Sequence, residues 1–105
     1  STTSSTSRTG GAAAVLEAET VPVVMKMFLE ELKALPELDH ASVKATFKKV
    51  QKTNKLNGKA VFMPIRVALT GNQHGPELAE MIPLLGVERT EKRILASLAK
   101  AGVKL

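Results

Sequence analysis

Residues 58–78 of the chain read GKAVFMPIRVALTGNQHGPEL. Pro64 suits the first turn of a short helix, because that turn does not need the backbone N–H that proline lacks. Gly71 is expected to end this helix in the left-handed conformation. A polar loop follows, and Pro76 is expected in the first turn of the next helix. The stretch therefore predicts two helices joined by a tight turn.

Helical signals continue on both sides of this stretch. Thr20 is expected to cap a helix whose apolar residues repeat at helical spacing until Pro36 stops it, and Asp39 is expected to cap the next one. Gly86 should end the helix that follows the turn, after Pro83 bends or shortens it. The last helix should place Ile94, Leu95 and Leu98 inward, with Gly102 as its stop. Together these signals predict an all-α fold, a small bundle of about five short helices within residues 20–105.

Residues 1–19 begin STTSSTSRTGG and form a Ser/Thr/Gly/Ala-rich segment that is expected to be flexible. A hydroxyl-rich, acid-free start with one arginine resembles the end of an organellar transit peptide, and a tag or linker remnant is the competing interpretation. Localisation in a mitochondrion or plastid is therefore one expectation. The other is a cytoplasmic location, if the chain is a piece of a bacterial protein.

Charge is unevenly distributed along the chain. Residues 40–76 hold six lysines and Arg66 but no acid, which gives this segment a formal charge of +7 within a chain whose total is +5. Such a block favours an anionic partner, although a lysine-rich face kept for solubility is an alternative.

The sequence offers no catalytic, metal or cofactor signature. It contains no cysteine, and His40 and His74 have no companion at metal-ligand spacing. No glycine-rich phosphate loop occurs, and no apolar run approaches the roughly 20 residues that cross a bilayer. We therefore expect no catalytic residue, metal, cofactor or small-molecule substrate, and no transmembrane segment.

The block at residues 58–78 resembles the GK-x-LFMPIRVALTG…GPEL region of bacterial-type and organellar glutamyl-tRNA synthetases, within their C-terminal anticodon-binding domain. The likeness is strong over residues 58–86 and weaker over 21–102. It implies the helical fold of that class I synthetase subdomain, and a non-catalytic module whose partner is the anticodon loop of tRNA. The catalytic half and its ATP signatures have no counterpart in this sequence, so the chain alone is expected not to be an enzyme.

The resemblance also implies which residues meet RNA. In the synthetases the arginine of the block and the tip of the following helix approach the first two anticodon bases. The matching positions here are Arg66, Gly75, Pro76, Glu77 and Leu78, with Thr70 and Gly71 shaping the turn. Four lysines are expected to attract phosphates, namely Lys48, Lys52, Lys55 and Lys59. Alternatively, Arg66 forms a structural ion pair with Glu77 or Glu80.

A second function remains open at this point. The chain is alternatively a synthetase-derived structural subunit of a large organellar assembly, such as a mitochondrial ribosome or a membrane energy-transducing complex like ATP synthase, with RNA binding lost.

No Tyr or Trp is present for unpaired bases to stack on. Phe62, which lies inside the block, is expected in the core.

Overall fold

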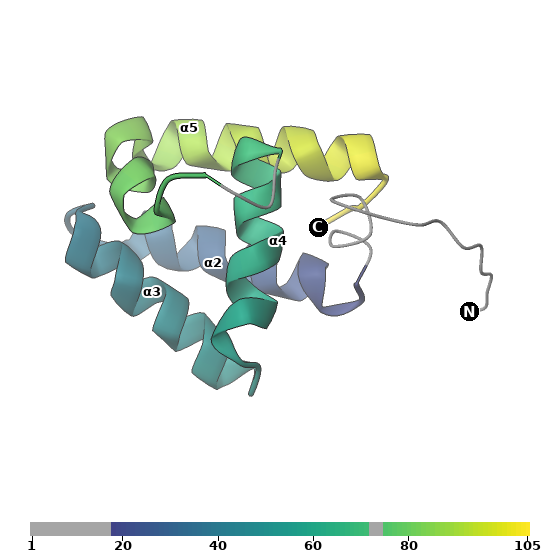
Figure 1. The fold of residues 1–105 in the computed structure, drawn as a ribbon, viewed down its shortest axis with the longest axis horizontal. Coiled ribbons are helices and arrows are strands. Elements are labelled where there is room, and N and C mark those ends of the chain that lie inside the picture. The colour runs from purple at the N-terminus through teal and green to yellow at the C-terminus, as the bar shows by residue number, and fades with distance from the viewer. Residues whose placement is uncertain (1–17, 72–74) are drawn as a thin grey trace.

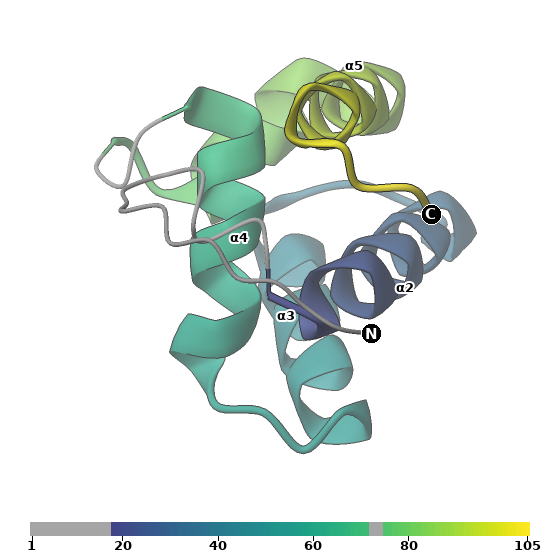
Figure 2. The same cartoon turned by 90° about the vertical axis from the view of Figure 1, so that its right-hand side faces the viewer.

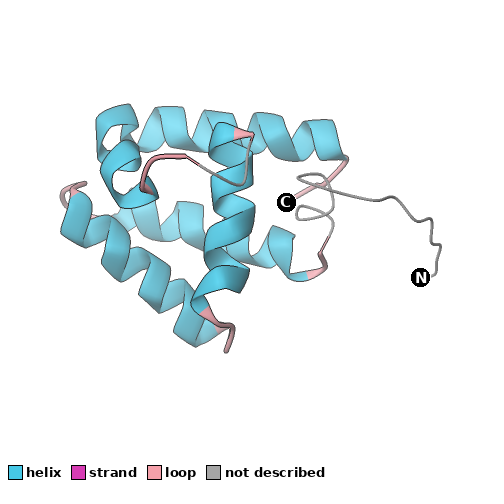
Figure 3. Cartoon of the chain, viewed as in Figure 1, coloured by secondary structure: helices cyan, strands magenta, loops and turns pink. Residues whose placement is uncertain are grey.

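The computed structural model describes residues 18–71 and 75–105, and within these ranges every regular element is a helix (Figures 1 and 3). The elements are α2 (Thr20–Ala34), α3 (His40–Thr53), α4 (Gly58–Thr70) and α5 (Leu78–Ala101). The expected all-α fold is thus confirmed, and the described residues form four helices where about five were expected. The flexibility expected of residues 1–19 falls almost wholly on residues outside the described ranges. None of the helices in those ranges is both long enough and apolar enough to span a bilayer.

The first two helices begin close to the positions that the sequence indicates. Thr20 is the first helical residue of α2 and not its cap, because Glu19 occupies the cap position, and its side chain makes no capping bond. Leu35 is extended, as expected for a residue before a proline, and ends α2. Asp39 does cap α3, since its Oδ1 accepts a hydrogen bond from the Ser42 backbone N–H at 2.8 Å.

This cap makes a pH-dependent contribution to stability. The hydrogen bond from the Ser42 backbone N–H favours the ionised carboxylate and holds the pKa of Asp39 below its ordinary value of 3.8. Because the folded-state pKa is the lower one, the stabilisation is present above pH 3.8 and is lost as the pH falls through the folded-state value. Asp39→Asn caps without titrating, and it should reduce the loss of stability between pH 5 and pH 2, measured by urea unfolding at each pH. Identical pH profiles for the two proteins would contradict this account.

Helix α4 starts earlier than the sequence predicts. Asn57 caps it by accepting a hydrogen bond from the Ala60 backbone N–H at 3.1 Å, so Pro64 lies inside the helix and the expected start at Pro64 is wrong. An internal proline removes one helical hydrogen bond. The longer helix offsets this loss by adding Val61 to the core, where it is 1% exposed. Gly71 adopts the left-handed conformation with φ 79°, which confirms the predicted end.

Helix α5 combines the last two predicted helices. Its cap is Glu77, whose carbonyl accepts the first helical hydrogen bonds, so Pro76 precedes the helix and the expectation that it lies in the first turn is wrong. Gly86 has φ 89° and ψ 161°, values that break the helix where an end was predicted. The helix ends at Gly102, as predicted, and this glycine is left-handed with φ 80°.

The core lies between α2 and α5, and α4 crosses both of these helices on one side (Figures 1 and 2). Each of the four helices contacts the other three. Helix α3 contributes only valines to the fully buried side chains. The larger ones come from the other three helices: Phe28, Met25, Leu32, Ile65, Leu78, Ile82, Ile94, Leu98. The Ser97 hydroxyl also donates to the Ala68 carbonyl at 2.7 Å and ties α5 to the end of α4.

One predicted core position on α5 is wrong. Leu95 is 41% exposed, whereas Ile94 and Leu98 are buried as expected. Thr90, Ile94 and Leu98 repeat every four residues and define the inward stripe, and Leu95 lies about a quarter turn away from it.

Candidate nucleic-acid interface

Arg66 lies on α4 in a position fixed by two contacts. Its guanidinium carbon sits 4.5 Å from the centre of the Phe62 ring, one helical turn earlier. Its Nη1 donates to the Gly75 carbonyl oxygen at 3.0 Å, across the loop that joins α4 to α5. Its Nε is buried and has no hydrogen-bond partner within the described residues. The side chain is therefore held in place with donor capacity left over.

The alternative of an ion pair between Arg66 and a glutamate is not observed. Within the described residues, neither Glu77 nor Glu80 forms an ion pair with Arg66, and Glu77 lies instead 3.8 Å from Nε2 of His40. The contacts that hold Arg66 are a ring face and a neutral carbonyl. No carboxylate of the described residues neutralises its positive charge, which leaves that charge available to an anionic or polar ligand.

The turn residues lie close to this arginine, which is half-buried. Thr70 and Gly71 close α4, with the Thr70 hydroxyl donating to the Arg66 carbonyl at 2.9 Å. Gly75 and Pro76 are exposed. Gly75 has φ 154°, and a Cβ added there would lie 3.9 Å from Nη1 of Arg66. A side chain would fit there without a clash, so the positive φ is what favours glycine at this position.

The last two candidates at the turn behave differently from each other. Glu77 is exposed at the start of α5, and its side chain makes no capping hydrogen bond to that helix. Leu78 is 0% exposed and belongs to the core. Its side chain therefore anchors the helix start and offers no surface to RNA.

The four candidate lysines are all exposed. None of them appears in the ion pairs of the described residues, in which the lysine partners are Lys33 with Glu91 and Lys49 with Glu31. Lys48 on α3 and Lys59 on α4 face a common groove, whereas Lys52 and Lys55 lie at the end of α3. Lys55 is left-handed with φ 54° and turns the chain toward α4.

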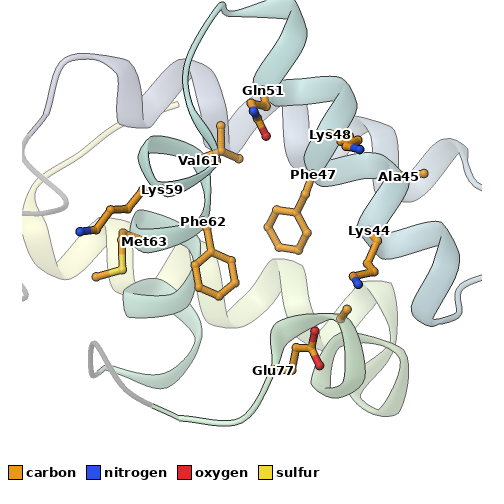
Figure 4. A pocket seen from close by; sticks show the side chains of 12 residues that line it. Lys44, Ala45, Phe47, Lys48, Gln51, Lys59, Val61, Phe62, Met63 and Glu77 are labelled. Atoms are coloured by element: carbon orange, nitrogen blue, oxygen red, sulfur yellow. The ribbon is translucent and has the colours of Figure 1, made fainter.

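A groove of about 760 Å³ lies between α3, α4 and the start of α5, and it was not predicted from the sequence (Figure 4). Phe47 and Phe62 point into it from facing helices, and Lys44, Lys48 and Lys59 line its edge. Sequence reasoning placed Phe62 in the core, but both rings are only half-buried. The groove could not be predicted from sequence spacing, because its two aromatic residues come from different helices.

The structure also brings together three side chains that the sequence kept apart. Ligand atoms of His40, Glu77 and Glu80 all lie within 4.8 Å of one another. All three residues are exposed, and the cluster is held by one long contact between His40 and Glu77. We assign no metal role to it, because exposed carboxylates gather in this way without a metal.

Comparison with known proteins places the chain in a family. A family model described as "Anticodon binding domain" matches residues 6–98. The glutamate–tRNA ligase of Desulfitobacterium hafniense is 48% identical over 90 residues, which cover 86% of this chain and 18% of that protein. The ligase of Bacillus cytotoxicus is 52% identical over 80 residues, which cover 76% of this chain and 16% of that protein. The chain therefore belongs to the anticodon-binding domain family.

A solved structure supports the same fold. The crystal structure of a glutamate tRNA ligase from Elizabethkingia meningosepticum, in complex with its amino acid, matches with a TM-score of 0.78 and 22% sequence identity. The match covers 86% of this chain and 18% of that one. The chain thus spans less than a fifth of the length of these relatives. They are bacterial proteins, and they give no support to an organellar location or assembly.

Proposed function

We propose that this chain is a non-catalytic tRNA-binding module that reads the anticodon loop of glutamate tRNA. The observation that carries the proposal is the state of Arg66, an arginine held by Phe62 and the Gly75 carbonyl whose charge meets no carboxylate within residues 18–71 and 75–105. A planar guanidinium can hydrogen-bond a base edge or stack on a base. Relatives that are glutamate–tRNA ligases supply the identity of the RNA.

Each part of the interface has a distinct task. Arg66 and the exposed backbone of residues 75–77 contact the first two anticodon bases, because uncovered N–H groups and carbonyls at a turn can pair with base edges. Lys48, Lys52, Lys55 and Lys59 attract the phosphates without reading sequence. No bond is made or broken by this chain, which contributes recognition to aminoacylation. A scaffolding role in an organellar assembly is not proposed, because no observation favours it.

The test compares two RNAs of equal length. The full 105-residue chain is titrated with the anticodon stem-loop of glutamate tRNA, and with the same stem-loop in which the first two anticodon bases are changed. We expect the changed RNA to bind at least about tenfold more weakly, since a wrong base in a specific site costs about 1–3 kcal/mol. Equal affinity for the two RNAs would overturn the proposal.

The lysines should determine how binding depends on salt. In one variant, glutamine replaces all four lysines, Lys48, Lys52, Lys55 and Lys59. The slope of log affinity against log salt concentration should become shallower by up to about 3, because each contact to a single-stranded phosphate contributes about 0.7 to that slope. A matched variant that replaces Lys26, Lys92, Lys100 and Lys104 loses the same charge from elsewhere and should change the slope by less than about 1. Equal slopes for the two variants would show that only net charge matters.

A further inference from the structure

The groove between α3 and α4 has a rigid aromatic floor. The rings of Phe47 and Phe62 meet edge to face, with their centroids 5.8 Å apart and an interplanar angle of 61°. Phe28, which is 0% exposed, stacks on Phe47 from within the core at 4.9 Å. Arg66 lies against Phe62. Because each ring is braced by a further side chain, the floor is already formed before any ligand arrives.

The edge of the groove is positively charged. Lys44, Lys48 and Lys59 line it, all three are exposed, and none takes part in the ion pairs of the described residues. Glu77 is the one carboxylate among the lining residues. An occupant that suits this site has a flat apolar face for the rings and a negatively charged backbone for the lysines. A nucleotide of single-stranded RNA combines both properties.

We propose that this groove is a second RNA subsite, in which one unpaired base of the anticodon loop stacks on Phe47 and contacts Phe62 edge to face, while its phosphates meet Lys44, Lys48 and Lys59. The inference rests on the proposed tRNA binding and names a nucleotide contact beyond the bases assigned to Arg66. Continuity favours RNA over an acidic peptide as the occupant. The Phe62 ring lines the groove and also lies against Arg66, so one RNA strand can pass from one site to the other.

Fluorescent base substitution tests this subsite. 2-Aminopurine is placed in turn at each unpaired position of the glutamate tRNA anticodon stem-loop, and the full chain is added to each RNA. We expect one position, outside the first two anticodon bases, to lose fluorescence on binding. Phe47→Leu should abolish that loss and weaken binding of the unmodified stem-loop about fivefold or more, the scale of one base stacked on an aromatic ring.

The variants are chosen so that a loss of binding in the groove can be told apart from a loss of binding at Arg66. Phe47 makes no ring contact with Arg66, so Phe47→Leu tests the groove without removing the support of the arginine. Leu95→Ala is the control, because Leu95 is an exposed apolar side chain on α5 that does not line the groove. This control should keep the fluorescence change.

The outcomes distinguish this inference from the proposed function. If the wild-type chain does not prefer the glutamate stem-loop over the altered one, both proposals fail. If it does, and Arg66→Ala weakens binding while no position responds to Phe47→Leu, only the second subsite is overturned. It is also overturned if an acidic amphipathic peptide binds in a Phe47-dependent manner while the RNA signal is indifferent to Phe47.

Discussion

Arg66→Ala is expected to weaken binding of the glutamate tRNA anticodon stem-loop by about 1–3 kcal/mol, or about 5- to 150-fold. The side chain is held by Phe62 and by the Gly75 carbonyl, so its donors are already oriented before RNA arrives. Fluorescence anisotropy at one fixed salt concentration measures the effect, since electrostatic contributions change with salt.

Two further substitutions show whether charge alone explains this loss. Arg66→Lys keeps the charge but lacks the planar fork of donors, so most of the affinity should still be lost. Arg93→Ala removes an exposed arginine from α5 and should change affinity by less than about 0.5 kcal/mol. Wild-type affinity in Arg66→Ala, or an equal loss in Arg93→Ala, would refute a specific role for Arg66.

Phe28→Ala is expected to lower the free energy of unfolding by about 3–5 kcal/mol, because it empties a large space in the core. Phe28 is 0% exposed and stacks on Phe47, so both packing and an aromatic contact are lost. Domains of this kind are stabilised by only about 5–15 kcal/mol in total, so the variant should be close to unfolding. Urea denaturation followed by circular dichroism measures the change.

Val23→Ala is the control for this prediction. Val23 lies on the same helix but is 52% exposed, and its truncation should change stability by less than about 0.5 kcal/mol. A loss below about 1 kcal/mol for Phe28→Ala would mean that the core is not organised around this ring.

The fold was predictable where local chemistry decides the structure. Three local predictions each depend on a few neighbouring residues, and all three are confirmed: Asp39 as a cap, Gly71 as a left-handed end and Gly102 as a stop. The start of α4 was missed because the rule for proline is also local, while the cap at Asn57 and the burial of Val61 together outweigh it.

The candidate interface was predictable only in part, because it depends on contacts between helices. The resemblance pointed to Arg66 and the turn, but its Phe62 and Gly75 partners appear only once the chain is folded. Leu78 looked like part of the turn and proves to be buried. The facing of Phe47 and Phe62 across α3 and α4 leaves no trace in spacing along the sequence, so the groove could not be foreseen.

The most direct test of RNA binding at this surface is to follow the backbone amide NMR shifts of the full chain during titration with the glutamate tRNA anticodon stem-loop. We predict that the largest shifts occur at Arg66, at residues 75–77 and along the facing sides of α3 and α4. Residues 92–100 of α5 should shift little. Changes concentrated on residues 92–100, or the absence of any saturable change, would contradict the account.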